Sequence, residues 1–356
     1  MPSNWTMFAA LCRIIGGRGR DTLQDCVDRG DMPQMIAMAT AQDVLPALAA
    51  RCYEQADWAD ALSAQQHQSL RSALLDNTRR NMQIMVQSIS MIRALNDAGI
   101  TPLLLKGTAQ LLTVNRQRPG FRKQADIDFT VPAASLLGAG EALLAQGYDF
   151  YRDGEILAGP AHALGDTATA LRTDAAHHHL PPLAKDGQAA CVELHRHFLP
   201  KRFQHRVALA GLFDTAVEHR IEGAAFLVPS TEYQLIHMVL GKLVHDGYLA
   251  RRMFPIREAA DYIALLDSAD GEFDSEWVAG QCGRAYRIFA QLVSELMNYP
   301  PAAPDSQAAI RHRIGMMRMR YDSTAPARLL DGYARAGHLT SALWYSPSKL
   351  PAFLRR

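Results

Sequence analysis

The amino-acid sequence predicts a mixed α/β protein, in which a small mixed sheet is flanked by helical regions on its N-terminal and C-terminal sides. Apolar residues recur at the helical spacing over roughly the first ninety residues and again after Pro229. Between these regions the apolar runs are short, have the length of strands and are separated by turn residues. We therefore expect three parts, residues 1–98, 99–228 and 229–356, with the sheet in the middle part.

The region before the sheet is predicted to end in a long amphipathic helix. Gly99 is placed as its C-cap, because glycine readily adopts the left-handed backbone that ends helices. The apolar residues expected to share one face of this helix are Met82, Met85, Val86, Ile89 and Ile92.

Three apolar runs of the middle part are predicted to be strands: 100–105, 125–131 and 190–194. A helix is expected over 133–146, between the second and third of these runs. Beyond Pro229, the helical period predicts a helix from Thr231 to about Leu266.

Length and composition place the chain among globular proteins. Its 356 residues can bury a sizeable core, and 48% are hydrophobic against 21% charged, which excludes a disordered chain. The formal net charge of +1 excludes binding of nucleic acid through overall charge. Any electrostatic function is therefore expected to be local.

The five cysteines are odd in number and show no CxxC spacing, which argues against a disulfide framework or a cysteine zinc site. No stretch approaches the roughly 18 apolar residues of a membrane helix. The apolar patch near the N-terminus is interrupted by Arg13 and lacks the flanks of a signal peptide. We therefore expect a cytoplasmic protein with reduced thiols.

Asp126 and Asp128 lie two positions apart in a predicted strand, so their side chains should share one face while Ile127 faces the core. Adjacent carboxylates repel each other, but a divalent cation between them makes the arrangement favourable, and oxygen ligands suit Mg²⁺ bound together with phosphates. A solvated strand end is the alternative, because a lone Asp-x-Asp is common.

Lys106-Gly107-Thr108 follows the preceding predicted strand, and a glycine there lets the backbone approach a phosphate closely. The loop that leads to the aspartates is basic, with Arg116, Arg118, Arg122 and Lys123. A triphosphate with its metal fits this combination, and an ordinary turn followed by a solvated loop is the alternative.

A third acid, Glu193, sits in the last predicted strand and would complete the acid cluster if that strand lay beside the aspartates. Three carboxylates are the number that two-metal phosphoryl or nucleotidyl transfer commonly uses.

The order of these motifs resembles the DNA polymerase beta superfamily of nucleotidyltransferases, whose pattern is Gly-Gly/Ser, then Asp-x-Asp, then a third acid on a later strand. The closer resemblance is to a broad bacterial group of nucleotidyltransferase family proteins. Its motifs stand here as Leu105-Lys106-Gly107, Arg122, Asp126-Ile127-Asp128-Phe129-Thr130-Val131, His178-His179-Leu180-Pro181-Pro182-Leu183 and Glu193-Leu194-His195. The similarity covers most of residues 80–265.

This resemblance implies a polymerase-beta-like core and the transfer of a nucleoside monophosphate from an NTP to an unknown acceptor, with release of pyrophosphate. Mg²⁺ or Mn²⁺ would be the cofactor. The residues implied as catalytic and metal-binding are Asp126, Asp128 and Glu193, and those implied to hold the triphosphate are Lys106, Gly107, Thr108 and Arg122. The acceptor could be a small molecule, a peptide or RNA.

The chain departs from the wider superfamily pattern in two ways: the gap between the glycine and the acid pair is longer, and Thr108 replaces serine. Two other functions stay open. One is transfer of a sugar or phosphoryl group from a nucleotide-activated donor, in polysaccharide or modified-peptide biosynthesis. The other is a non-catalytic nucleotide sensor, although a sensor would be expected to have lost one of the acids.

Several basic side chains outside the acid cluster are candidate contacts for acceptor or phosphate: His178, His179, His195, His237, Lys242 and His245. Polar packing in the core is the alternative for them. The tract His177–His179 is not expected to bind zinc, because consecutive residues rarely ligate one ion. The basic stretch from Arg311 to Arg356 either binds an anionic partner or is a solvated helical surface.

Overall fold

The computed structural model describes residues 2–54, 62–150, 178–269, 272–300 and 307–322. The chain forms two compact units. One contains residues 1–42, 238–263 and 275–356, and the other contains residues 43–237 and 264–274. The predicted division into three parts along the sequence stays a prediction.

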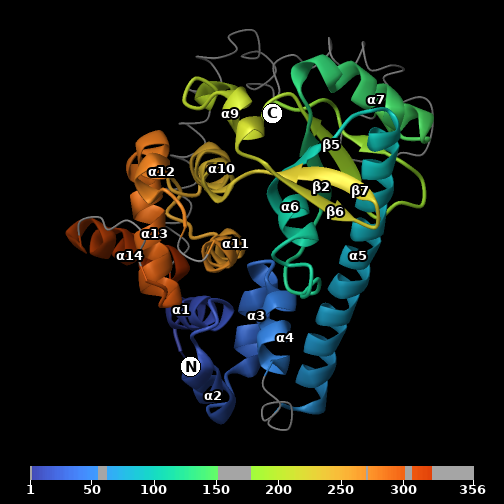
Figure 1. Cartoon of the computed structure of the whole chain (residues 1–356). Coiled ribbons are helices and arrows are strands. Elements are labelled where there is room, and N and C mark those ends of the chain that lie inside the picture. The colour runs from blue at the N-terminus through green and yellow to red at the C-terminus, as the bar shows by residue number, and fades with distance from the viewer. Residues whose placement is uncertain (1, 55–61, 151–177, 270–271, 301–306, 323–356) are drawn as a thin grey trace, which may run out of the picture. The chain divides into compact units, whose positions relative to one another are not determined.

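The second unit is built on a mixed sheet, which confirms the predicted fold class (Figure 1). Seven strands are present among the described residues, in the order β3-β4-β5-β2-β1-β7-β6. Their bounds are β1 Leu103–Leu104, β2 Asp126–Thr130, β3 Asp149–Phe150, β4 Leu183–Ala184, β5 Cys191–His195, β6 Val217–Ile221 and β7 Ala224–Val228. Two neighbouring pairs are parallel, β2 with β5 and β1 with β7, and the others are antiparallel.

The parallel pairing of β2 with β5 separates apolar from polar side chains. Ile127 lies opposite Val192, and both are fully buried in the core. On the other face Asp128 lies opposite Glu193, and Thr130 lies opposite His195. Because side chains alternate along a strand, this register sends one set to the core and the other to the candidate site.

The helices of this unit include α4 (Leu45–Tyr53), α5 (Ala64–Asp97), α6 (Lys106–Leu112), α7 (Leu136–Ala145), α9 (Leu209–Asp214) and α10 (Thr231–His237). The longest, α5, contacts both β7 and α7 (Figure 1). It begins with a capping box formed by Ser63 and Gln66. It ends before Gly99, whose φ of 75° confirms the predicted glycine C-cap.

The predicted apolar face of α5 is wrong in part. Ile89 and Ile92 are buried as expected, but Met82 and Val86 are 55% and 68% exposed. The buried stripe instead includes polar residues, because the side chains of Asn77, Asn81 and Gln87 bond to backbone groups of the sheet unit. A pattern of apolar residues alone does not show such a stripe.

The asparagines of α5 hold the loop that precedes β2. Asn77 donates to the carbonyl oxygens of Gly120 at 2.8 Å and Arg122 at 3.1 Å, and Asn81 donates to that of Arg122 at 2.6 Å. Arg80 donates to the carbonyl oxygen of Gln124 at 3.4 Å. These bonds satisfy loop carbonyls and fix the approach of the chain to the aspartates.

Other predicted elements differ in extent. The first strand shortens to β1, and the helix over 133–146 starts with a 3-10 turn before α7. The hairpin of β6 and β7 was not predicted. Its turn residues Glu222 and Gly223 have φ of 48° and 84°, as a two-residue type I′ turn requires, so Glu-Gly between two strand-length runs was the available signal.

The helix predicted from Thr231 to about Leu266 is not continuous. After α10 the chain continues as a π-helix, η4 (Met238–His245), and a non-helical segment precedes α11 (Ile256–Ser268). Wider turns of this kind shift the side chains that follow, so His237 and His245 cannot be assigned to one face from α-helical spacing.

The first unit is helical, as expected for the ends of the chain. Its helices include α1 (Asn4–Ile15), α2 (Arg20–Asp28), α3 (Met32–Ala41), α12 (Ser275–Cys282), α13 (Arg284–Met297) and α14 (Gln307–Asp322). Phe8 of α1 stacks on Tyr321 of α14 with ring centroids 4.0 Å apart. Among the described residues, no helix combines the length and the apolar character that crossing a membrane requires.

Gln87 offers a test of how α5 supports the sheet. Its side-chain amide donates to the carbonyl of Ala190 at 2.7 Å and accepts from the Ala190 N–H at 3.0 Å, in the interior. Gln87→Ala should lower the free energy of unfolding by about 2–4 kcal/mol, because two buried backbone groups lose their partner. Urea denaturation measures this change. The matched control Gln83→Ala, at an exposed position of the same helix, should change stability by less than about 0.5 kcal/mol.

Candidate active site

The acid cluster is positioned by backbone contacts between β2 and the segment that enters α6. The Leu105 N–H donates to the carbonyl oxygen of Asp128 at 2.9 Å. The Asp128 N–H donates to the hydroxyl oxygen of Thr108 at 2.8 Å. Thr108 is fully buried, so its hydroxyl supports the strand beneath the acid.

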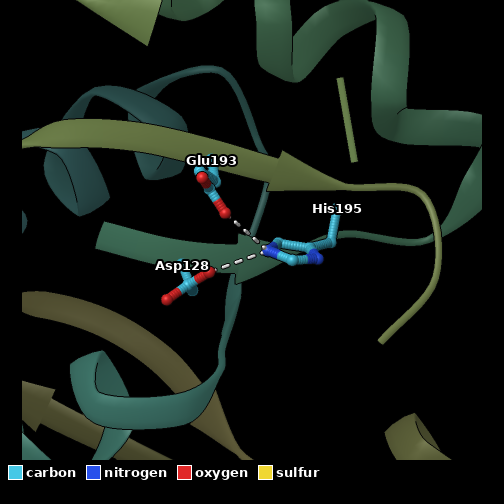
Figure 2. A group of neighbouring side chains, drawn as sticks. All are labelled: Asp128, Glu193 and His195. Carbon is cyan, nitrogen blue, oxygen red and sulfur yellow. Dashed lines mark hydrogen bonds and ion pairs between the residues drawn. The ribbon is translucent and has the colours of Figure 1, made fainter. Parts of the chain in front are cut away.

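Asp128, Glu193 and His195 converge on the polar face of β2 and β5 (Figure 2). His195 Nε2 donates to Asp128 Oδ1 at 2.8 Å and lies 3.6 Å from Glu193 Oε2. Asp128 and His195 are 1% and 0% exposed, whereas the Glu193 side chain is 19% exposed. Asp128 and His195 therefore form the buried part of the cluster, and solvent reaches the cluster at Glu193.

Lys106 provides the positive charge of this cluster. Its Nζ forms an ion pair with Asp128 Oδ1 and lies 3.6 Å from Glu193 Oε2. The Lys106 backbone has φ of 50°, a left-handed conformation that costs a non-glycine residue about 1 kcal/mol or more. Burial alone would lower the pKa of Lys106, but the charges of Asp128, Glu193 and Asp126 outweigh it and raise the pKa. The lysine is therefore a permanent cation at this position.

The three acids differ in pKa. Burial alone would raise the pKa of Asp128, but Lys106 and the hydrogen bond from His195 outweigh it and hold the pKa well below its usual range. Burial alone would raise the pKa of Glu193, but the nearby His195, 3.6 Å from Glu193 Oε2, and the charge of Lys106 outweigh burial and the charge of Asp128 and lower the pKa. Burial and the charge of Asp128 raise the pKa of Asp126 to about 6. Asp126 therefore binds a proton more readily than the other two acids.

Arg122 and Gln124 lie against Gly107. Arg122 Nη1 donates to Gln124 Oε1, and the Gln124 amide nitrogen lies 3.5 Å from the Thr108 hydroxyl. A Cβ on Gly107 would lie 2.1 Å from Gln124 Oε1 and 2.2 Å from Arg122 Nη1. A side chain at this position would therefore force the ends of Gln124 and Arg122 to move. The structure thus brings Lys106, Gly107 and Arg122 together beside the acids, although their contact with phosphate stays a prediction.

The residues present fit a divalent cation. One oxygen each from Asp128 and Glu193 and one nitrogen from His195 lie within 4.8 Å of one another. The second oxygen of Asp128, Oδ2, is buried and has no hydrogen-bond partner among the described residues. Carboxylates suit Mg²⁺ and Mn²⁺, and an imidazole is better tolerated by Mn²⁺. The predicted ligand set contained Asp126, which lies one pleat along β2 and outside this group of three, and did not contain His195.

A family model described as an uncharacterised nucleotidyltransferase matches residues 28–298 of the chain. The chain belongs to this nucleotidyltransferase family. The match confirms the predicted resemblance, since it spans the sheet, the acid cluster and helices on both sides. Comparisons with curated proteins and with solved structures gave no match.

Three further histidines of the chain lie near the cluster. The rings of His178 and His179 lie 5.3 Å and 5.5 Å from that of His195, and His179 bridges to His195 through the backbone. Burial, together with the charge of Lys106, lowers the pKa of His178 to about 2 and that of His237 to about 3. His237 packs edge-on against Phe198. These imidazoles are neutral at physiological pH.

The other predicted contacts are placed elsewhere or not described. Lys242 pairs with Asp246 at 3.0 Å in the first unit, where His245 also lies. His177 and residues 323–356 of the basic C-terminal stretch lie outside the described residues. The roles of Lys242, His245 and the C-terminal stretch stay predictions.

Two features of the site were missed by reasoning from the sequence. Gln124 is buried and links Arg122 to the strand through a bond to the Asp126 carbonyl. A polar amide just before the Asp-x-Asp strand was the available signal. The ion pair of Lys106 with the acids was also missed, because its side-chain direction follows from a left-handed backbone that the sequence does not show.

Gly107→Ala tests the packing of Gly107 against Arg122 and Gln124. The added methyl group should displace both side chains and lower the free energy of unfolding by about 1–3 kcal/mol. Urea denaturation measures the change. In the control Gly138→Ala the new methyl group meets one atom at 3.6 Å, so this helix position should gain up to about 1 kcal/mol. Unchanged stability in Gly107→Ala would contradict the assigned packing.

Asp126→Asn tests the electrostatic strain of the cluster. The folded-state pKa of about 6 lies above the ordinary 3.8, so the ionised side chain opposes folding above pH 6 and has no effect once both states are protonated. The variant should therefore be more stable than the wild type by about 1–2 kcal/mol at pH 8, and the gain should fall toward zero as the pH approaches 4. Denaturation at both pH values measures it, with exposed Asp186→Asn as control. A gain independent of pH would point to amide packing instead.

Proposed function

We propose that the protein is a nucleotidyltransferase that depends on Mg²⁺ or Mn²⁺ and moves a nucleoside monophosphate from an NTP to an acceptor, with release of pyrophosphate. The observation that carries the proposal is the in-register pair Asp128 and Glu193 with Lys106 between them, in a chain that belongs to a nucleotidyltransferase family. Neighbouring acids with a cation on a partly exposed face suit the binding of a metal and a triphosphate.

In this proposal Asp126 and Asp128 hold the ion and Glu193 completes the site, with His195 as a further donor. Asp128 Oδ2 has no hydrogen-bond partner among the described residues, and the short distances between the donor atoms of Asp128, Glu193 and His195 support these three residues as ligands. Asp126 is included because the resemblance implies it. A bound divalent ion would neutralise charge on the reacting phosphate and lower the barrier to attack. Thr108 and His195 fix the orientation of Asp128 through bonds to its N–H and its Oδ1.

The triphosphate would contact Lys106 and Arg122, and Gly107 would leave room for it. The Lys106 side chain is 34% exposed, and the Arg122 guanidinium lies against Gly107, the next residue. The Thr108 hydroxyl is buried, so Thr108 would not contact the triphosphate directly and would instead hold Asp128 in place by accepting a hydrogen bond from its N–H. Guanidinium and ammonium groups are the usual partners of phosphate oxygens.

The proposed transfer is a single displacement at the α-phosphorus of the NTP. The acceptor hydroxyl oxygen bonds to the α-phosphorus, the bond from that phosphorus to the bridging oxygen of the β-phosphate breaks, and pyrophosphate leaves with that oxygen. The acceptor proton passes to a carboxylate of the cluster, and Glu193 is the proposed base because it is the most exposed of the converging groups. His178, His179 and His237 are proposed to contact the acceptor as neutral hydrogen-bonding groups.

Labelled nucleotides distinguish this proposal from its alternatives. Incubation with an NTP labelled at the α-phosphate, in the presence of small-molecule, peptide or RNA fractions, should place the label on an acceptor. Label transfer from the γ-phosphate instead would indicate phosphoryl transfer, and transfer only from a sugar nucleotide would indicate a glycosyltransferase. Nucleotide binding without any transfer would support a sensor.

Asp128→Asn should abolish metal-dependent nucleotide binding. The substitution removes a charge from the centre of the cluster, so turnover per folded molecule should fall by several orders of magnitude. Calorimetry with each of the four NTPs, with Mg²⁺ and with EDTA, measures binding, and pyrophosphate release measures turnover.

The stability of the variant must be measured as well. Lys106 loses its closest partner in Asp128→Asn, so the free energy of unfolding should fall by about 3 kcal/mol. Asp186→Asn, which removes an exposed charge, should bind and turn over as the wild type does. Wild-type nucleotide affinity that is the same in EDTA and in Mg²⁺ would contradict the proposed role of the ion.

A further inference from the structure

We infer that Lys106 is an internal counter-ion that occupies the place of the divalent cation, so that the cation binds tightly only together with a nucleotide whose phosphates receive the displaced lysine. The inference rests on the proposed function, and it adds that the metal and the nucleotide bind together. The free protein keeps its acid cluster compensated by its own ammonium group, and metal and nucleotide bind as a coupled pair.

The geometry of the ammonium group is the first support. Lys106 Nζ contacts Asp128 Oδ1 and lies 3.6 Å from Glu193 Oε2. Both carboxylates belong to the group that could hold a metal. Mg²⁺ approaches its oxygen ligands to about 2.1 Å, so an ion bound to both would meet the ammonium at close range. Two like charges cannot share this position in a buried environment.

The second support is that the lysine can leave while the acids cannot. The Lys106 side chain is 34% exposed, whereas Asp128 is 1% exposed and held from three directions by Lys106, His195 and Thr108. The lysine stem has four rotatable bonds, and its head can move toward solvent without a change in the sheet.

The third support is the strained backbone of Lys106. A non-glycine residue with φ of 50° is held by its surroundings, and the pairing with Asp128 and Glu193 supplies that restraint. Gly107 and the guanidinium of Arg122 lie next to it, so a phosphate bound by Arg122 would also be within reach of a lysine that swings outward.

The consequence follows from linkage. A divalent ion that binds alone must move Lys106 away from two carboxylates and leave the ammonium without an anion. An ion that binds with a nucleotide gives the ammonium new anionic partners, so each ligand strengthens the binding of the other. Removal of the lysine charge should therefore strengthen binding of the ion alone and weaken binding of the nucleotide.

The test is a titration of Mn²⁺ into the nucleotide-free protein, with free Mn²⁺ followed by electron paramagnetic resonance. Lys106→Met should bind Mn²⁺ about tenfold or more tightly than the wild type, within the usual range of coupling between two ligands. The matched control Lys123→Met removes a lysine that pairs with exposed Asp43 at 2.6 Å, and its affinity for Mn²⁺ should equal that of the wild type. Lys106→Met should also bind a non-hydrolysable NTP with Mg²⁺ more weakly than the wild type. Equal or weaker binding of Mn²⁺ by Lys106→Met would overturn the inference.

The wild-type protein gives a second readout in case Lys106→Met does not fold. In ¹H–¹⁵N spectra of the lysine ammonium groups, the Lys106 signal, assigned by its loss in Lys106→Arg, should shift when Mg²⁺ and the non-hydrolysable NTP are added together. A signal that stays unchanged with both ligands bound would overturn the inference and leave the nucleotidyltransferase proposal intact. Failure of any divalent ion to bind, with or without nucleotide, would contradict the nucleotidyltransferase proposal itself and the inference with it.

Discussion

The parallel pairing of β2 with β5 is the constraint on which the candidate site depends. It places Asp128 directly beside Glu193, and it does so in the interior, where like charges repel most strongly. The same register that buries Ile127 against Val192 fixes the distance between the acids. A shift by one residue would send the acids into the core, so the pairing that buries the hydrophobic residues also fixes the position of the acids.

Three residues around Asp128 stabilise its buried negative charge or fix its position. Lys106 reaches the acids from a strained turn, His195 donates to Asp128 from the next polar position of β5, and Thr108 accepts from the Asp128 backbone. Asp126 receives less compensation and has the raised pKa. The difference between neighbouring acids on one strand thus arises from what each one contacts, and it gives the cluster groups of different basicity.

Helix α5 links the two strands that carry the acids. Asn77 and Asn81 bond the loop before β2, and Gln87 bonds Ala190, the residue before β5. Side-chain amides suit this task because each offers both donors and an acceptor. A rigid helix with several such bonds keeps both strand entries at fixed spacing, which a loop would not do.

Much of the fold and of the acid cluster could be predicted from local sequence patterns. The strands predicted over 125–131 and 190–194, the glycine end of α5 and the position of Ile127 in the core follow from alternation and turn chemistry, which act between near neighbours. The exposed Met82 and Val86, the pairing of Lys106 with the acids and the π-helix after His237 could not be predicted in this way. The first two depend on tertiary contacts, because the polar stripe of α5 and the left-handed lysine bond to residues distant in the sequence.

The separation of β2 and β5 along the chain has a consequence for folding. The two strands are neighbours in the sheet, but β3 and β4 come between them in the sequence, and parallel pairing of distant segments closes a long loop. We expect such contacts to form late in folding, whereas α5 and the β6–β7 hairpin contain local contacts that form early. The acids would then meet only after most of the sheet unit has assembled. In that case their repulsion speeds unfolding and has little influence on the rate of folding.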